Sequence, residues 1–516
     1  MIDTSAIDRA MDLLPQRFAG PGGVAAVMHQ GRVVAARAWG LADLVSARPM
    51  TRQTRLPVCS ITKQFTCAAV LAALGAPEAL DARLSPRLPG LRGLRPTVRQ
   101  LCHNQSGLRD YWAMTVLEGA RAEQAFPRAA ALPMLAAMQS VQFAPGLRHS
   151  YSNGNFRLLA EMLEEETGQP LEALFRRHLW DPAGMATAAL APDTRHPVDG
   201  VVGHEGSAQA GFMAAENGIW WQGDAGMVAS LDDMLAWERW IDATREAADG
   251  LYRRLSAPVA FADGNPAGYG FGLGRDNVGG VAITGHGGAL RGFRAYRLHA
   301  AVPRLSVVVM FNHEGAARDA ARDLLRAALR LTPPVSAPVP PDRAGQWLCP
   351  ETGLLARIEV EHGRARLQFA TGAEDLRSEG GGLVSAETML RVEAAGLVLE
   401  RPRDNQRVTL APAPPVATAD AGEIGGRWLC PESGRAMEVI LAGTAAFARF
   451  EGRLGTGRAE PAVPAGRDLW RIQTRRSMDA PAPGDWTLQI CRDGAGRPIA
   501  ARLGCWLARG IEYRRA

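Results

Sequence analysis

The chain has 516 residues, of which 47 % are hydrophobic and 22 % charged, close to the average usage of globular proteins. This composition excludes a disordered, fibrous or low-complexity protein, and the length suggests about three domains. The 58 basic and 53 acidic residues give a formal net charge of +5 without basic runs, which argues against a nucleic-acid-binding protein.

The sequence also lacks the marks of a membrane or metal-binding protein. No apolar run approaches the ~18 residues that span a bilayer, and the first residues have neither the basic start nor the apolar stretch of a signal peptide. The seven cysteines are widely spaced, and none lies in a Cys-x-x-Cys pattern. We therefore expect a cytoplasmic protein with reduced thiols and no membrane contact. The histidines lack ligand spacing, so no metal and no cofactor are expected.

The N-terminal part of the chain predicts a mixed domain. Residues 23–30 and 32–40, joined at Gly31, predict a β-hairpin. Helical periodicity then predicts helices over residues 61–74, 156–166, 231–243 and 316–331. Strands are predicted over residues 282–286 and 305–311. Because strands at both ends enclose helices, we expect an α+β domain with an antiparallel sheet flanked by helices.

The C-terminal part predicts a duplicated β module. A Pro-rich stretch at residues 332–341 is typical of a stiff linker. Gln346-Trp-Leu-Cys-Pro-Glu-Thr-Gly353 then recurs as Arg427-Trp-Leu-Cys-Pro-Glu-Ser-Gly434. In the first copy, alternating segments at residues 356–360 and 365–369 are typical of small antiparallel β domains. The predicted divisions are a domain over 1–331, the linker over 332–341, and β domains over 342–411 and 420–516.

Lys63 is the only lysine among the 58 basic residues. Most surface lysine positions accept arginine, so a lone lysine suggests a task that arginine cannot perform. A lysine amine can lose its proton inside a protein, whereas a guanidinium stays charged. The alternative is chance, and the neighbouring residues have to decide between the two.

Those neighbours favour chemistry. Ser60-Ile-Thr-Lys63 opens a predicted helix and places its serine and lysine on one helix face. The electropositive helix start favours an attacking alkoxide and disfavours an extra proton on Lys63. A base near neutrality needs the lysine pKa lowered by about 2–3 units, which burial can supply. We therefore predict a Ser–Lys nucleophile pair, with an N-cap serine beside a solvated lysine as the alternative.

Tyr151-Ser-Asn153 lies in a loop before a predicted helix. The tyrosine hydroxyl can relay a proton to a leaving amine, and the asparagine amide can hold both Lys63 and a substrate carbonyl. In isolation, turn chemistry with a packed tyrosine would explain this motif as well.

His286-Gly-Gly288 follows the strand residues 281–284, and glycines on a strand often mark a place where a ligand approaches the backbone. Backbone N–H groups of Ser60 and of Gly288 or Ala289 can then hold a developing oxyanion. A structural histidine is an equally good explanation when this motif is taken alone.

In this order and at these intervals, the three motifs resemble those of the penicillin-recognising serine hydrolases, a family of class C β-lactamases, DD-carboxypeptidases, esterases and D-aminopeptidases. Supporting stretches begin at His103, Gly226 and Tyr269. The resemblance implies a β-lactamase-like catalytic domain. It departs at the third motif, where β-lactamases usually carry Lys-Thr-Gly. His286 replaces that lysine, which argues against β-lactam hydrolysis and carboxylate-terminal substrates.

Within that family, two C-terminal β domains and a His-x-Gly third motif are most similar to the D-stereospecific aminopeptidases. The resemblance implies that both β domains are barrels, that the enzyme is a homodimer, and that a loop of the last barrel, at residues 475–485, reaches the active site. Asp479 matches the acid of that loop that binds the substrate's free amino group. An ammonium in a partly dry pocket needs such an anion. The alternative is a solvated acidic loop.

The resulting prediction is a serine aminopeptidase that releases an N-terminal D-amino acid, foremost D-alanine, from small amides, esters or short peptides. Ser60 is expected to attack, Lys63 to take its proton, and Tyr151 to pass that proton to the leaving amine. Asn153 positions the substrate, and His286 tunes Tyr151 or the substrate. The alternatives are an esterase or β-lactamase-type hydrolase of the same family, and a non-catalytic binder of D-peptides or peptidoglycan fragments. The intact set of motifs argues against the binder.

Overall fold

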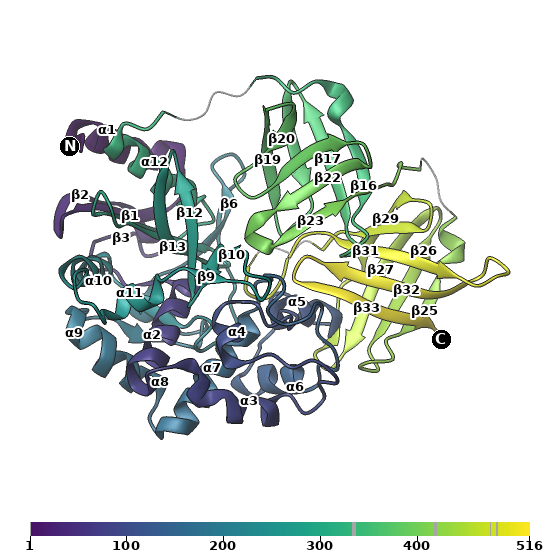
Figure 1. Ribbon diagram of the computed structural model, residues 1–516, viewed down its shortest axis with the longest axis horizontal. Coiled ribbons are helices and arrows are strands. Elements are labelled where there is room, and N and C mark those ends of the chain that lie inside the picture. Colours follow the sequence, from purple (N-terminus) through teal and green to yellow (C-terminus); the bar gives the residue numbers. More distant parts are fainter. Residues whose placement is uncertain (1, 333–336, 417–419, 475, 481–482) are drawn as a thin grey trace.

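The structure is a computed structural model that describes residues 2–332, 337–416, 420–474, 476–480 and 483–516. Parts of the predicted linker (333–336) and of the predicted loop (475 and 481–482) lie outside the described residues. In Figure 1 the N-terminal chain forms a body of helices and strands, and the C-terminal chain forms two β bodies on one side of it. The two termini lie at opposite ends of the molecule.

An antiparallel sheet of eight strands forms the centre of the N-terminal domain, in the order β11-β12-β13-β14-β15-β1-β2-β3. The predicted hairpin is present as β1 and β2, and Gly31 between them has a φ of +72°, which suits glycine. β15 lies beside β1, with Met310 opposite Val24. The strands are β1 (Gly22–His29), β2 (Arg32–Asp43), β3 (Arg48–Pro49), β11 (Tyr269–Gly270), β12 (Leu273–Val278), β13 (Val281–Leu290), β14 (Phe293–Ala300) and β15 (Leu305–Phe311).

Alternation along the central strands divides the core into two layers. On β1, Val24 and Ala26 face the large core beneath most of the helices, whereas Ala25 and Val27 face a smaller core. The helices α1 (Thr4–Arg17) and α12 (Ala317–Leu329) cover that smaller core. The other helices are α2 (Thr62–Leu74), α3 (Asp81–Arg87), α4 (Val98–Cys102), α5 (Tyr111–Leu117), α6 (Ala131–Ala136), α7 (Asn153–Thr167), α8 (Leu171–Phe175), α9 (Asp181–Ala183), α10 (Leu231–Ala243) and α11 (Leu251–Leu255).

The four predicted helices are confirmed as α2, α7, α10 and α12. The largest difference is at α7, which begins at Asn153, three residues before the predicted start at 156. The Asp110 carboxylate accepts a hydrogen bond from the Asn153 backbone N–H and so caps this helix from a distant part of the chain. Within the described residues no single helix is long and apolar enough to cross a membrane; only the bent pair Cys59–Leu74 and Pro77–Arg87 passes by length and composition.

The remaining strands of this domain are short. They are β4 (Leu56–Pro57), β5 (Ala189–Leu190), β6 (His204–Ser207), β7 (Gly211–Ala214), β8 (Met227–Ala229), β9 (Val259–Ala260) and β10 (Pro266–Ala267). β4 and β5 both pair with β8, and β6 pairs with β7.

The first C-terminal sheet curls into a nearly closed barrel. Its outermost strands, β23 (Gln406–Thr409) and β24 (Ala411–Pro412), are separated in the chain by Leu410 alone, so the two edges of the sheet must meet. The other strands, in the order in which they pair from β24 to β23, are β16 (Gly345–Leu348), β17 (Leu355–Glu361), β18 (Arg364–Gln368), β19 (Ala373–Glu379), β20 (Gly382–Val384), β21 (Met389–Glu393) and β22 (Gly396–Arg401).

The second C-terminal sheet closes fully, because β26 pairs with both β25 and β27. Its strands are β25 (Gly426–Leu429), β26 (Ala436–Ala442), β27 (Ala445–Gly452), β28 (Gly455–Thr456), β29 (Glu460–Gly466), β30 (Leu469–Ile472), β31 (Trp486–Arg492), β32 (Pro498–Cys505) and β33 (Ala508–Arg515). The repeated motif supplies the first strand of each sheet, and both of its cysteines, Cys349 and Cys430, are buried. The expected fold class is confirmed, and the domain boundaries stay a prediction.

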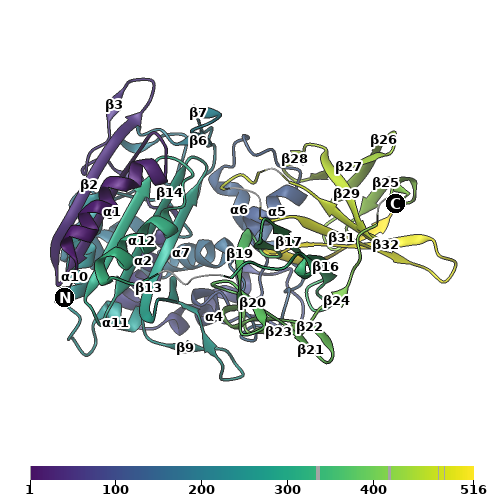
Figure 2. The same cartoon turned by 90° about the horizontal axis from the view of Figure 1, so that it is seen from above.

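Both barrels join the N-terminal domain through buried polar contacts. Glu118, directly after α5, is fully buried and accepts hydrogen bonds from Arg435 Nε at 2.8 Å and from the Arg453 N–H at 3.0 Å. From the first barrel, buried Asp404 Oδ1 lies 2.9 Å from His149 Nδ1. Figure 2 shows the barrels together on one side of the N-terminal domain. Loops of both barrels can therefore reach that side.

Candidate active site

Ser60 lies in a 3₁₀ turn, η1 (Cys59–Ile61), that leads directly into α2. Cys59 before it has a φ of +51°, a left-handed conformation that is unfavourable for a residue other than glycine. β13 runs close beside this turn, and a Cβ on Gly288 would lie 2.2 Å from the Val58 carbonyl oxygen. Only glycine at this position therefore lets the strand approach the serine.

Lys63 is the second residue of α2, and its side chain is fully buried. Its Nζ lies 3.0 Å from Ser60 Oγ, 2.7 Å from Asn153 Oδ1 and 2.6 Å from the Asp224 carbonyl oxygen. Burial lowers the pKa of Lys63 to about 8, although nearby carboxylates, first that of Asp224, oppose the shift. A neutral amine can keep two N–H donors on Asn153 and Asp224 and turn its lone pair to the Ser60 hydroxyl.

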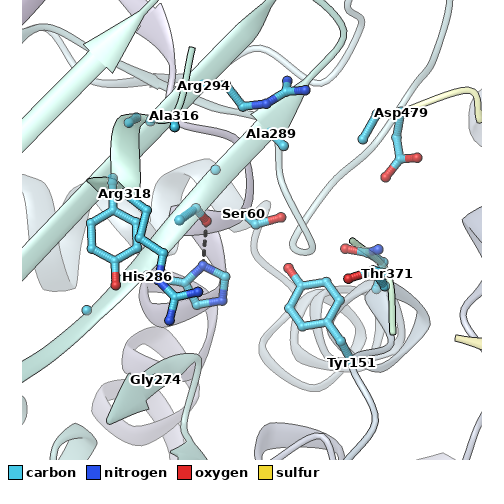
Figure 3. Close-up of a pocket in the computed structure, with 18 of the residues that line it drawn as sticks. Ser60, Tyr151, Gly274, His286, Ala289, Arg294, Ala316, Arg318, Thr371 and Asp479 are labelled. Atoms are coloured by element: carbon cyan, nitrogen blue, oxygen red, sulfur yellow. Dashed lines mark hydrogen bonds between the residues drawn. The ribbon is translucent and has the colours of Figure 1, made fainter. Parts of the chain in front are cut away.

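Tyr151 lines the same cavity as Ser60, with its hydroxyl directed at the serine (Figure 3). Burial raises the pKa of Tyr151 well above its ordinary value, although a hydrogen bond with Ser60 opposes this. The phenol therefore stays protonated at neutral pH. Of the two groups beside the serine, Lys63 is the one that can accept its proton, and Tyr151 is suited to relay one.

The amide of Asn153 is oriented by Asp110, a buried acid directly before α5. Asp110 Oδ1 accepts from the Asn153 backbone N–H at 2.7 Å and from Asn153 Nδ2 at 3.0 Å. With the Nδ2 group held there, the amide oxygen faces Lys63. Sequence reasoning missed Asp110, because an acid before a helix is also an ordinary N-cap, and Asp110 does accept from the Ala113 N–H at 3.4 Å.

His286 is a neutral, fixed imidazole. Its Nδ1 lies 2.5 Å from the Gly287 carbonyl oxygen, which can only accept, so Nδ1 carries the proton. Nε2 is then free to accept from the Tyr269 hydroxyl at 3.0 Å. Burial, with the positive charge of Lys63 as a second cause, lowers the pKa of His286 to about 3. The imidazole thus holds the Tyr269 hydroxyl and does not titrate near neutral pH.

The strand that carries His286 presents a free edge to the serine. β12 pairs with β13 as far as Gly274 opposite Gly285, and among the described strands residues 286–290 pair with β14 alone. Gly288 and Ala289, the predicted oxyanion positions, lie on this stretch and line the same cavity as Ser60.

Asp479 comes from the second barrel, more than four hundred residues beyond Ser60 in the chain. Its Oδ1 accepts from Ser477 Oγ at 2.9 Å, and its carbonyl oxygen accepts from the Arg291 N–H at 3.0 Å. Burial raises the pKa of the Asp479 carboxyl to about 6. The other acid of the loop, Asp485, pairs with Arg471 at 3.1 Å and is not directed at the serine's cavity.

One cavity of about 710 Å³ brings these groups together. In Figure 3, His286 and Asp479 lie on opposite sides of Ser60, and Tyr151 points at it. The predicted site residues that line the cavity are Ser60, Tyr151, Asn153, His286, Gly288, Ala289 and Asp479, and Lys63 lies buried next to the serine. The arrangement has the parts that acyl transfer needs: a nucleophile beside a base, a proton relay and a strand edge for an oxyanion.

Comparison with known proteins identifies the family. A family model described as Beta-lactamase matches residues 7–332, and one described as D-aminopeptidase, domain B, matches residues 337–514. A D-aminopeptidase of Cereibacter sphaeroides (strain ATCC 17023) is 55 % identical over 515 residues, which cover 100 % of this chain and 99 % of that protein. The chain belongs to the D-aminopeptidase family. A D-aminopeptidase of Brucella melitensis biotype 2 is 46 % identical over 518 residues, with the same coverage.

Solved structures share the fold of this D-aminopeptidase family member at low identity. The octameric penicillin-binding protein homologue from Pyrococcus abyssi covers 99 % of both chains with a TM-score of 0.52 and 16 % identity. The D-amino acid amidase from Ochrobactrum anthropi SV3 covers 63 % of this chain and 97 % of its own, with a TM-score of 0.52 and 19 % identity. Family membership confirms the predicted enzyme class, a serine hydrolase, and does not favour the non-catalytic alternative.

Proposed function

We propose that this member of the family is an aminopeptidase that releases an N-terminal D-amino acid, foremost D-alanine, from peptides, amides or esters through a seryl acyl-enzyme. The observation that carries the proposal is that Asp479 shares one cavity with Ser60, whose hydroxyl contacts Lys63. A fixed anion beside an acyl-transfer centre suits a substrate whose reacting carbonyl lies next to an ammonium group. The preference for D-residues is carried over from the names of the relatives.

Acylation begins with attack by Ser60 Oγ on the carbonyl carbon of the substrate. As the new C–O bond forms, the hydroxyl proton passes to Lys63 Nζ, 3.0 Å away, and the carbonyl electron pair moves to oxygen. The N–H groups of Ser60 and of Gly288 or Ala289 hold this oxyanion. A neutral lysine is essential here, because an ammonium has no lone pair to accept the proton.

Collapse of the intermediate breaks the bond to the leaving amine, which needs a proton. Tyr151 donates its own proton to the amine and receives one from the Lys63 ammonium, so the phenol and the neutral lysine are both restored. A water molecule then attacks the carbonyl carbon of the acyl-enzyme, and its proton goes to Lys63. Ser60 leaves as the ester bond breaks and takes a proton back from Lys63, which releases the free amino acid. Throughout, Asn153 keeps its amide oxygen on Lys63 at 2.7 Å.

Substrate comparison tests this function directly. We expect hydrolysis of D-alanine p-nitroanilide, with L-alanine p-nitroanilide, a chromogenic cephalosporin and a simple ester much poorer substrates. A fluorophosphonate should label the protein at Ser60, located by mass spectrometry, and Ser60→Ala should abolish both labelling and activity. A preference for the cephalosporin or the ester would instead support another hydrolase of the same family.

The pH dependence of acylation should report the Lys63 pKa. For N-acetyl-D-alanine p-nitrophenyl ester, which has no titrating amine, kcat/KM should rise about tenfold per pH unit and level off above about 8, because only the neutral amine accepts the serine proton. For D-alanine p-nitroanilide, kcat/KM should fall again above ~8, where the substrate's amine loses its proton. A flat profile between pH 6 and 8 for the ester would contradict a neutral-lysine base.

The resemblance to D-stereospecific aminopeptidases also implies a homodimer, and the sequence predicts a cytoplasmic location. We include both in the proposal. Light scattering on the purified protein and fractionation of cells that express it would test them.

A further inference from the structure

An ion-pair network centred on Glu205 joins the loop of Asp479 to the N-terminal domain. Glu205 lies on β6 and is 7 % exposed. Its carboxylate pairs with the Arg476 guanidinium of the loop, and Arg291 Nη2 lies 3.2 Å from Glu205 Oε2. Burial acts to raise the pKa of Glu205, but the two guanidinium groups outweigh it and hold that pKa below its usual value. The carboxylate is therefore ionised while the pairs are intact.

Arg291 connects this network to Asp479 a second time. It follows β13 directly, is 3 % exposed, and its Nη1 donates to the Ala122 carbonyl oxygen at 3.0 Å. The Arg291 side chain thus contacts Glu205, while its backbone N–H donates to the Asp479 carbonyl oxygen at 3.0 Å. Glu205 therefore reaches the Asp479 segment by two routes, one through Arg476 and one through Arg291.

On the side of Glu205, the described part of the loop borders a cavity. A cavity of about 500 Å³ lies here, lined by Glu205, Arg291 and Arg476 together with Thr474. Met478 is buried in the core and anchors the loop at one point. Met478, next to Asp479, fixes where this segment attaches. The polar contacts of Arg476 with Glu205 and of Asp479 with Arg291 then fix how the Asp479 carboxylate is oriented.

We propose that Glu205 is a positioning residue that sets the place of the Asp479 carboxylate relative to Ser60. The inference rests on the proposed function, because it deepens the role given there to Asp479. Glu205 lies outside the cavity of the serine and touches no reacting atom. Its loss should therefore weaken the hold on a substrate's ammonium group and leave the chemistry of Ser60 and Lys63 unchanged.

The test compares Glu205→Gln and Arg476→Gln with the wild-type enzyme on two substrates. For D-alanine p-nitroanilide, we expect each variant to raise KM about tenfold with kcat changed by less than about twofold. For N-acetyl-D-alanine p-nitrophenyl ester, both constants should stay within about twofold. Because Arg476 acts through Glu205, the double variant should lose about as much as Glu205→Gln alone.

Arg458→Gln is the matched control. Arg458 belongs to the same barrel and lines the same 500 Å³ cavity, but it pairs with Glu123 at 3.2 Å and not with Glu205. We expect wild-type kinetics from it. Arg476 is 39 % exposed, so Arg476→Gln carries the test if Glu205→Gln does not fold.

Equal losses on both substrates would show a merely structural role and overturn the inference, as would unchanged KM for D-alanine p-nitroanilide in both variants. If the wild-type enzyme is active and either of these results is found, only this inference is overturned and the proposed function stands. A wild-type enzyme that is inactive on D-alanine p-nitroanilide overturns the proposed function, and this inference with it.

Discussion

Replacing Lys63 by arginine should lower kcat/KM by about 10³-fold on D-alanine p-nitroanilide and on the N-acetyl ester alike, near the middle of the range for loss of a general base. The guanidinium keeps its proton at any pH at which the protein is folded, so it cannot accept the one that Ser60 releases. Steady-state kinetics at pH 8 measures the effect. Because the wild-type pKa is about 8, about half of the wild-type enzyme then carries the neutral amine.

Two further variants separate lost chemistry from damaged packing. Lys63→Met keeps a long unbranched side chain in the buried site without a basic atom and should be as inactive as Lys63→Arg. Thr66→Val, one turn later on α2, removes the hydrogen bond from Thr66 Oγ1 to the Gly223 carbonyl oxygen (2.7 Å) without touching Ser60, and should stay active. Normal activity in Lys63→Arg would mean that a neutral amine is not the base.

Local geometry alone predicts only one part of the site, the Ser60–Lys63 pair; the roles of Tyr151, His286 and Asp479 are predicted through the family resemblance. Ser60 and Lys63 lie one helical turn apart, so a helix beginning near residue 61 is enough to bring them into contact, and the structure places Nζ 3.0 Å from Oγ. The lone lysine added a chemical reason to choose this serine. The strands and helices around the site could also be predicted, because burial of one or both faces gives each element a periodic pattern of apolar residues in the sequence.

The residues that tune these groups could not be predicted in the same way. Asp224 holds Lys63 through its backbone carbonyl, and no side-chain pattern records such a contact. Tyr269, which donates to His286, lies in a stretch that resembled the family, but its role appears only once β11 and β13 lie in one sheet. Asp110 and Glu205 likewise depend on packing between distant segments. These roles depend on tertiary contacts, which the residue type at a single position of the sequence does not reveal.

Asp479 is linked to Lys63 by charge. Asp479 is one of the carboxylates that raise the pKa of Lys63 against the effect of burial. A substrate ammonium bound at Asp479 would cancel that negative charge, so the lysine would lose its proton more readily in the complex than in the free enzyme. Binding of the correct substrate and readiness of the base are then coupled through one side chain.

Replacing Asp479 by asparagine should lower kcat/KM for D-alanine p-nitroanilide by roughly 10²-fold or more, the effect usual for removing one partner of a desolvated charge pair. Activity on the N-acetyl ester should stay within about threefold, because that substrate has no ammonium to bind. The pH profile of kcat/KM for Asp479→Asn on the N-acetyl ester should shift to lower pH, since the carboxylate that raises the Lys63 pKa is gone. Asparagine keeps the oxygen that accepts from Ser477 Oγ, so the loop should stay in place.

Asp485→Asn provides the matched control on the same loop. Asp485 pairs with Arg471, away from the cavity of the serine, so neither substrate should distinguish this variant from the wild-type enzyme. If Asp479→Asn instead lowered activity on the blocked and free substrates by the same factor, the carboxylate would not be the ammonium site. An unshifted pH profile on the N-acetyl ester would in addition reject the coupling to Lys63, because a charge close enough to bind the substrate beside Ser60 must also act on the neighbouring amine.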